Sequence, residues 1–225
     1  MSQPPDLPTG RFSSWLRCTR SALQQESGVD VPCGECTACC TASYFIHVEP
    51  GETQTLARIP AELLFAAPGL AAGNVLLGYD KHGRCPLLVA GKCSIYEDRP
   101  LTCRSYDCRV FAAAGIAADR DLITQRARRW RFDYRTSADR DQQAAVQAAA
   151  EFLRERAACF PGGAAPDNPA QIAVLAVKVY EVFLEHAGEP GTSGRVASDA
   201  DVARAVVRAN EESEAGRDRR GTLRA

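Results

Sequence analysis

The chain has 225 residues with 27 basic and 28 acidic side chains, so that its formal net charge is −1. This balance gives no overall attraction to nucleic acid or to an anionic membrane. The sequence contains no run of the ~18 apolar residues that a membrane-spanning helix requires. Residues 1–10 are polar and proline-rich, without the apolar stretch of a secretory leader. We therefore expect a soluble cytoplasmic protein, large enough to build its own core.

The N-terminal half is predicted to consist of short elements separated by turns. Residues 1–10 are expected to be disordered or extended, and Phe12–Gln25 to form an amphipathic helix that carries a partly buried Cys18. A run of turns is expected over 31–41. The next elements, in chain order, are a strand at 43–48, short helices at 52–58 and 61–67, a strand at 74–79, a strand at 85–89, and a tight hairpin at 90–92 that brings Cys85 and Cys93 together.

The C-terminal half is predicted to be mainly helical. Pro100 favours the start of a short helix that carries Cys103, and strict alternation over 129–135 predicts a half-buried strand. Three longer helices are expected at 139–159, 169–186 and 199–211. Asn168 is the predicted N-cap of the second, and Gly188 its predicted stop.

Together these elements predict an α+β fold that is mostly helical, with a small irregular β-sheet around a cysteine-rich metal centre. Four regions are expected along the chain: an N-terminal segment and helix (1–30), a cysteine-cluster metal-binding region (31–136), C-terminal helices packed on it (137–212) and a mobile tail (213–225).

Eight of the ten cysteines fall into two clusters. The first is packed as C-G-E-C-T-A-C-C, and the second spreads over a longer loop; their members are Cys33, Cys36, Cys39 and Cys40, then Cys85, Cys93, Cys103 and Cys108. A C-x-x-C turn directs two sulfurs toward one point, as a soft metal ion requires. A disulfide framework and a set of inert buried thiols are the competing interpretations. The metal interpretation is favoured, because a chain of this length does not need disulfides to form a core.

The spacing leaves open which metal binds and how many sites exist. Zinc and iron both accept four thiolates, and iron does so either alone or in an iron–sulfur cluster. Eight thiolates could serve two sites, or one site together with reactive or bridging cysteines. Adjacent Cys39 and Cys40 are expected to point in different directions on an extended chain.

The three histidines are weaker candidates. His82 precedes Cys85 by three residues and could replace a sulfur, although an exposed turn histidine is the favoured interpretation. His47 is expected to serve the core or a hydrogen bond, and His186 to lie at a helix C-terminus.

The cysteine pattern resembles a known family. The run C-G-E-C-T-A-C-C at 33–40, then Cys85-Pro86-Leu87, then G-K-C-S-I-Y-E-D-R-P-L-T-C-R-S-Y-D-C at 91–108, is similar to the YkgJ-like cysteine-cluster family, a zinc- or iron-chelating domain with the pattern C-x-x-C-x-x-C-C. The resemblance covers about residues 31–110. It implies metal ligation by Cys33, Cys36, Cys39, Cys40, Cys85, Cys93 and Cys103, with Cys108 as a further ligand.

Two more residues of the matching element, Arg99 and Arg104, could neutralise the negative charge of a four-thiolate site. Ordinary surface ion pairs are the alternative interpretation for such arginines.

Three functions are therefore considered. The first is a metal-binding protein that chelates zinc or iron and has a possible protein partner. The second is an iron–sulfur redox enzyme, because flagellin lysine methylases carry the same cysteine pattern. Whether the chain is an enzyme stays open, since it contains no G-x-G-x-x-G, P-loop or catalytic triad. The third is a nucleic-acid binder, suggested by arginines interleaved with Trp130, Phe132 and Tyr134, but a solvated basic strand face is the favoured interpretation of that pattern.

Overall fold

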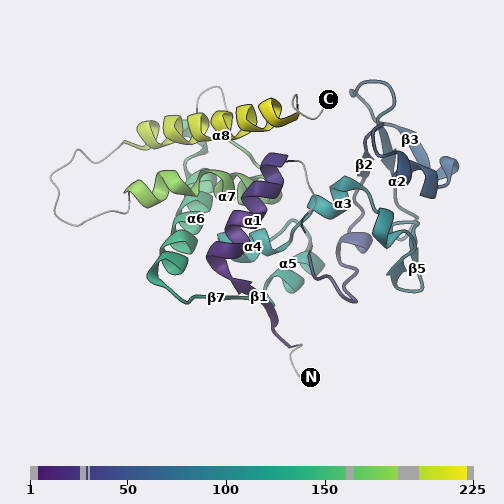
Figure 1. Ribbon diagram of the computed structural model, residues 1–225, viewed down its shortest axis with the longest axis horizontal. Helices are drawn as coiled ribbons and strands as arrows, with labels where there is room; N and C mark the ends of the chain where they lie inside the picture. The colour runs from purple at the N-terminus through teal and green to yellow at the C-terminus, as the bar shows by residue number, and fades with distance from the viewer. Residues whose placement is uncertain (1–4, 26–28, 30, 161–164, 187–197, 222–225) are drawn as a thin grey trace. The chain divides into compact units, whose positions relative to one another are not determined.

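A computed structural model describes residues 5–25, 29, 31–160, 165–186 and 198–221. The fold is α+β, as predicted, with long helices and small sheets of two or three strands (Figure 1). The chain divides into two compact units. Met1–Gln25 and Cys108–Ala225 form one, the helical unit, and Glu26–Asp107 form the other, the cysteine unit. The four predicted regions do not coincide with this division and stay a prediction.

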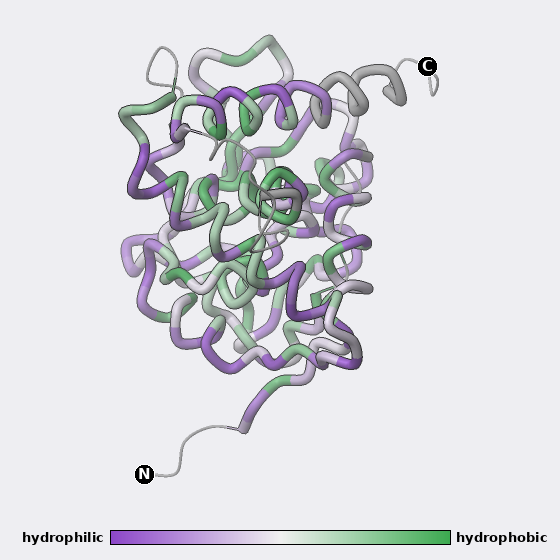
Figure 2. Tube along the Cα trace, turned by 90° about the vertical axis from the view of Figure 1, so that its left-hand side faces the viewer, coloured by the Kyte–Doolittle hydropathy of each residue, from purple (hydrophilic) through white to green (hydrophobic). Residues whose placement is uncertain are grey.

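The helical unit is built on packed helices. In chain order these are α1 (Phe12–Gln25), α4 (Arg109–Ala114), α5 (Asp121–Ala127), α6 (Ser137–Glu155), the 3-10 turn η4 (Ala157–Cys159), α7 (Pro169–His186) and α8 (Asp199–Gly221). Helix α7 packs against α6, α4 and α8, and α1 packs against α8 and α6 (Figure 1). The tube in Figure 2 changes between hydrophobic and hydrophilic within single helical turns, which is the pattern of helices with one buried face.

The helix predictions agree with the structure where local signals are strong. Helix α1 has the predicted bounds, and the backbone N–H of Ala170 donates to Asn168 Oδ1 at 2.8 Å, which confirms the N-cap of α7. Helix α8 is ten residues longer than predicted. The predicted stop at Gly188 and the end of the tail, 222–225, lie outside the described residues.

The N-terminal segment, predicted to be disordered or extended, is an extended strand over Leu7–Arg11. Strand β1 (Leu7–Arg11) pairs in parallel with β7 (Trp130–Asp133), and Leu7 N donates to the Arg129 carbonyl at 2.8 Å. The alternation that predicted β7 is confirmed, because Trp130 and Phe132 are buried and their neighbours are exposed. The partner of β1 lies more than a hundred residues away, so a local reading of 1–10 had no signal for the pairing.

Asp139 joins the start of α6 to β1 and α1. Its side chain is fully buried and accepts hydrogen bonds from Arg11 Nε (2.9 Å) and from the backbone N–H groups of Ser13 (3.2 Å), Arg135 (3.0 Å) and Thr136 (2.9 Å). Burial alone would raise the pKa of Asp139, but the hydrogen bonds from Ser13, Arg11 and Thr136 outweigh it and hold that pKa far below its usual range.

None of the described helices combines the length and the apolar character needed to cross a bilayer.

The cysteine unit contains two small sheets. Strands β2 (Ile46–Val48), β4 (Val75–Leu77) and β3 (Leu64–Ala66) form an antiparallel sheet in the order β2-β4-β3, and β5 (Leu88–Val89) pairs with β6 (Lys92–Cys93). The connecting helices and 3-10 turns are η1 (Cys39–Thr41), α2 (Thr53–Arg58), η2 (Ala61–Leu63), η3 (Tyr96–Asp98) and α3 (Leu101–Ser105). The helix predicted at 61–67 is wrong after residue 63, because Leu64–Ala66 leave the 3-10 turn to pair with β4.

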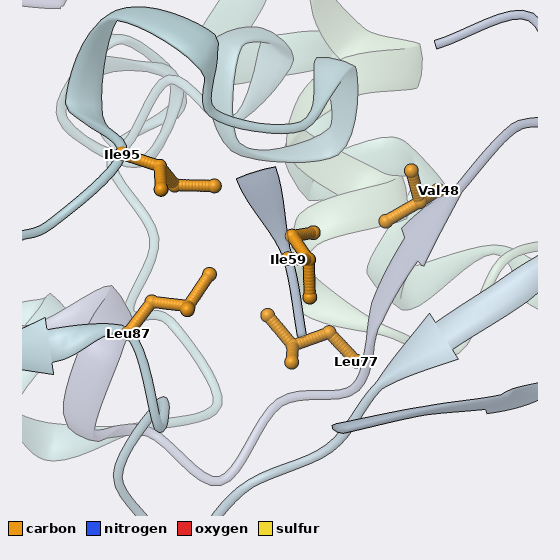
Figure 3. Close-up of a cluster of buried hydrophobic side chains, with 5 residues drawn as sticks. All are labelled: Val48, Ile59, Leu77, Leu87 and Ile95. Atoms are coloured by element: carbon orange, nitrogen blue, oxygen red, sulfur yellow. The ribbon is translucent and has the colours of Figure 1, made fainter. Parts of the chain in front are cut away.

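A compact hydrophobic cluster forms the core of this unit. Figure 3 shows its five buried side chains, which come from the three-stranded sheet and from residues outside the strands: Val48, Ile59, Leu77, Leu87 and Ile95. Cys85 and Cys93 pack against this cluster as partly buried neighbours. The core therefore positions two of the predicted metal ligands directly.

We expect Asp139→Asn to destabilise the helical unit at neutral pH, because the uncharged amide loses the ion pair with Arg11. The folded-state pKa of Asp139 is depressed, so the stability from its ionised form is complete above the unfolded pKa of about 3.9 and is lost as pH falls below it. The variant should thus lose part of the pH dependence of unfolding that develops as the pH falls from about pH 5 to about pH 3. Thermal unfolding measured across this range tests the expectation. Asp141→Asn, an exposed position on the same helix, is the control and should behave like the wild type.

Candidate metal centre

The first cysteine cluster lies on a turn followed by a 3-10 helix. The backbone N–H of Cys36 donates to the Cys33 carbonyl at 3.0 Å, and Gly34 between them has φ +55°, a left-handed conformation that glycine adopts without strain. Cys39 and Cys40 lie in η1 rather than on the predicted extended chain. Because a 3-10 helix has three residues per turn, these two neighbours still point in different directions, as predicted.

Backbone pairing joins this first loop to the second cluster. Cys85 N donates to the Cys40 carbonyl at 2.7 Å, and Ser43 N donates to the Gly83 carbonyl at 3.0 Å. Gly83 has φ +75°, and a β-carbon there would collide with the Ser43 hydroxyl. The left-handed backbone at position 83 therefore favours glycine.

The predicted hairpin between Cys85 and Cys93 is confirmed. Ala90 and Gly91 both have positive φ, +49° and +76°, as a two-residue type I′ turn requires. Leu88 lies opposite Cys93 in the register. Cys85 precedes β5 and Cys93 ends β6, and both cysteines pack against the hydrophobic cluster.

Cys103 lies on α3, and hydrogen bonds hold the first two residues of this helix in place. Leu101 N donates to Glu52 Oε2 at 2.6 Å, and Thr102 Oγ1 donates to the His47 carbonyl at 2.7 Å. Glu52 and Thr102 were not identified from the sequence as positioning residues, because their partners lie about fifty residues away and no local motif connects them.

Four thiols form a mutually interacting set, which we call the thiol tetrad: Cys40, Cys85, Cys93 and Cys103. Burial raises the pKa of Cys40 to about 11, and charge on Cys85, Cys93, Cys33 or Cys36 raises it further. Burial raises the pKa of Cys103 to about 12, with added repulsion from Cys40, Cys85 and Cys93. The pKa of Cys85 is also raised, by burial and by charge on Cys93. Every pair within the tetrad therefore interacts.

One cation acts on the tetrad. The positive charge of Arg99 lowers the pKa of Cys103, against the larger effects of burial and the other thiols. The Arg99 guanidinium lies 4.0 Å from the centre of the Tyr96 ring and donates to the Tyr96 carbonyl at 2.7 Å, so its position is fixed. Arg104 is the other arginine proposed to neutralise thiolates. Its Nη2 lies 3.9 Å from Glu52 Oε2, so it forms an ion pair with that carboxylate.

The histidines contribute little to this centre. His47 Nε2 is hydrogen-bonded to Asn74 Oδ1 at 2.8 Å, as expected for a hydrogen-bonding residue. His82 is exposed on the turn before Gly83, in agreement with the favoured interpretation. His186 ends α7.

Cys108 belongs to the helical unit. It precedes α4, is buried, and its Sγ accepts a hydrogen bond from the Trp130 indole at 3.2 Å. The two cysteines that belong to neither cluster are in the same unit. Cys18 was predicted to be partly buried but is exposed, and Cys159 lies in η4. All ten cysteines lie in the described part of the chain, and all are thiols rather than disulfides.

The donor chemistry of the tetrad fits a soft metal ion, since four thiolates are the ligand set of structural zinc and of iron–sulfur centres. Among the described residues, no three His, Cys, Asp or Glu side chains converge closely enough to hold an ion as they stand. Metal binding would therefore have to draw the sulfurs together from their present rotamers.

Comparison with known proteins supports the interpretation of the cysteine pattern. The model of the CxxCxxCC family, described as "Putative zinc- or iron-chelating domain", matches residues 32–150, which is more than half of the chain. Neither the curated proteins nor the solved structures contain a match.

We expect Leu77→Ala to destabilise the cysteine unit by about 2–5 kcal/mol, as for other large-to-small substitutions in a packed core. Leu77 is 1% exposed and belongs to the cluster against which Cys85 and Cys93 pack, so the same substitution should loosen the tetrad. Denaturant unfolding measures the loss. Leu70→Ala, at a side chain that is 54% exposed, is the matched control, and an equal loss in both variants would contradict the role of the cluster.

Proposed function

The chain belongs to the CxxCxxCC family, and we propose that it binds zinc or iron through the thiolates of Cys40, Cys85, Cys93 and Cys103. The observation that carries the proposal is that these four partly buried thiols, which come from three separate segments, all influence one another's ionisation. Neighbouring thiols in a partly buried site repel one another when ionised, and a bound cation removes that repulsion.

The scaffold supports such a site. The turn around η1, the β5–β6 hairpin and the anchored α3 each present tetrad thiols with little chain entropy left to lose. A divalent ion with four thiolates carries a net charge of −2, and Arg99 supplies a nearby positive charge. Charge and hydrogen bonds next to the sulfurs are the usual means by which a protein tunes a thiolate centre.

The other four predicted ligands are not members of the tetrad. Cys33 and Cys36 act electrostatically on Cys40, and Cys39 is its neighbour in η1. Cys108 is in the helical unit and is bound by Trp130. We therefore propose the tetrad as the minimal site and regard these four cysteines as ligands only if more than one ion binds per chain.

The metal is to be identified on protein purified without oxygen, by elemental analysis and an optical spectrum. Zinc in a colourless protein would support a chelating or structural centre. Iron with acid-labile sulfide and visible absorption would support the alternative, an iron–sulfur redox centre. The absence of disulfides among the ten cysteines favours a reducing compartment, and we propose the cytoplasm.

Replacing a tetrad cysteine should abolish metal binding, whereas replacing a cysteine outside the clusters should not. We expect Cys40→Ser and Cys103→Ser to be purified with a small fraction of the wild-type metal and with reduced thermal stability, because metal binding contributes folding free energy. Cys18→Ser and Cys159→Ser are the matched controls and should keep the wild-type metal content. Equal metal content in all four variants would refute the ligand assignment.

Metal affinity should rise with pH. The pKa of Cys40 is raised to about 11 and that of Cys103 to about 12, so both are protonated at neutral pH in the metal-free protein. An ion must displace these protons in order to bind. Calorimetric titrations in two buffers of different ionisation enthalpy should show proton release, and the affinity should fall as the pH is lowered. Binding without proton release would mean that thiolates are not the ligands.

A further inference from the structure

The three-stranded sheet of the cysteine unit is covered at one edge and open at the other. Its order is β2-β4-β3, so the outer strands are β2 and β3. Helix α3 packs against β2, and Thr102 Oγ1 on this helix donates to the His47 carbonyl on that strand. Among the described residues, no further strand pairs with the outer edge of β3. An uncovered strand edge is a template for pairing with another strand.

The free backbone groups of β3 belong to Leu64 and Ala66. One step beyond β3, in the same register, Ala67 N donates to the Asn74 carbonyl at 3.0 Å. Hydrogen-bonded and non-hydrogen-bonded pairs alternate along an antiparallel ladder, so Leu64 and Ala66 direct their backbone groups away from β4. The Leu64 N–H is taken by the Ala61 carbonyl. The Leu64 carbonyl and both backbone groups of Ala66 face outward, and no hydrogen bond from the described part of the chain reaches them.

Exposed aromatic rings lie beside this open edge. Phe65 at the centre of β3 is 45% exposed, and Phe45 and Tyr79 are 54% and 42% exposed. The Phe45 ring centre lies 5.8 Å from that of Phe65 and 5.0 Å from that of Tyr79. We call these three residues the aromatic patch. Its two phenyl rings cover Gly78, where a β-carbon would lie 3.4 Å from Phe65 and 3.9 Å from Phe45. Exposed apolar groups of this kind mark interaction surfaces.

The chain around the open edge carries no charge. From Leu63 to Tyr79 there is no Asp, Glu, Lys, Arg or His, although natural edge strands are commonly protected by charged side chains. In a symmetric dimer the twofold axis brings each residue near the axis close to its own copy. A charge there would repel its equivalent, and an uncharged edge avoids this repulsion. The edge therefore suits a second copy of the same chain.

We propose that β3 pairs in antiparallel fashion with β3 of a second copy, so that two chains form a dimer with one continuous sheet. With Phe65 opposite its own copy, the Ala66 N–H of each chain donates to the Leu64 carbonyl of the other. The same register places the two aromatic patches side by side on one face of the sheet. The outward backbone groups favour a protein strand over a lipid surface, because acyl chains offer no hydrogen-bond partners.

The test is sedimentation velocity of the full-length protein over a range of concentrations, with a reducing agent present to exclude disulfide-linked dimers. We expect a reversible, concentration-dependent dimer, because the paired strands are short. Phe65→Lys places a charge at the axis and should shift the protein to monomer. Ala66→Pro removes the outward N–H without removing a bond to β4, as an edge strand allows, and should also abolish the dimer.

Leu122→Lys is the matched control, since its side chain is 52% exposed and lies on α5 in the helical unit. It should dimerise like the wild type. Hydrogen exchange of the wild-type protein gives a readout that needs no variant: protection of the Ala66 amide should increase with protein concentration. Circular dichroism checks that each variant is folded, and Ala66→Pro decides the question if Phe65→Lys is not.

Two results would overturn the proposal. A wild-type protein that is monomeric at every concentration would leave the open edge to an extended segment of a different protein. A dimer that persists in both folded β3 variants, with an Ala66 amide that exchanges equally fast at all concentrations, would place the contact between the two copies elsewhere.

Discussion

The cost of ionising partly buried, neighbouring thiols is the constraint on which the chemistry of the cysteine unit depends. Cys40 and Cys103 are removed from solvent and placed beside other thiols, so that ionising any one of them makes the next harder to ionise. At neutral pH the metal-free thiols are protonated and pack as small apolar side chains, so this cost arises only when they ionise to bind a metal. A bound cation reverses the sign of the interaction, and the arrangement is then stabilising.

The rest of the unit is a thin scaffold around these thiols. Its strands are two or three residues long, and the hydrophobic cluster at its centre is made of five buried side chains. The hydrophobic core of a unit of this size gives only a small margin of stability, so additional links between its segments matter. The backbone bond between Cys40 and Cys85 and the Glu52 contact at the start of α3 are such links. A metal ion joining the three segments would be the strongest of them, so that binding and folding are coupled.

The sequence predicted those features that depend on residues close together in the chain, and it missed contacts between distant segments. The C-x-x-C turn, the hairpin at Ala90–Gly91 and the Asn168 cap are each determined by residues next to one another, and each is found in the structure. The pairing of β1 with β7 and the contact of Glu52 with Leu101 join distant segments, so no local pattern announces them. The tetrad is intermediate in this respect. The sequence predicts its members together with Cys33, Cys36 and Cys39, and spacing alone does not rank them as ligands.

Cys108 shows why spacing along the chain does not by itself define a site. It follows Cys103 by five residues, and a continuous turn between them would place both at one centre. Helix α3 instead ends at Ser105, and a new helix, α4, begins directly after Cys108. The division between the two compact units falls at the same point, between Asp107 and Cys108. Within the helical unit the Cys108 sulfur already has a polar partner in the Trp130 indole, so ligation of a metal by Cys108 would have to replace that hydrogen bond.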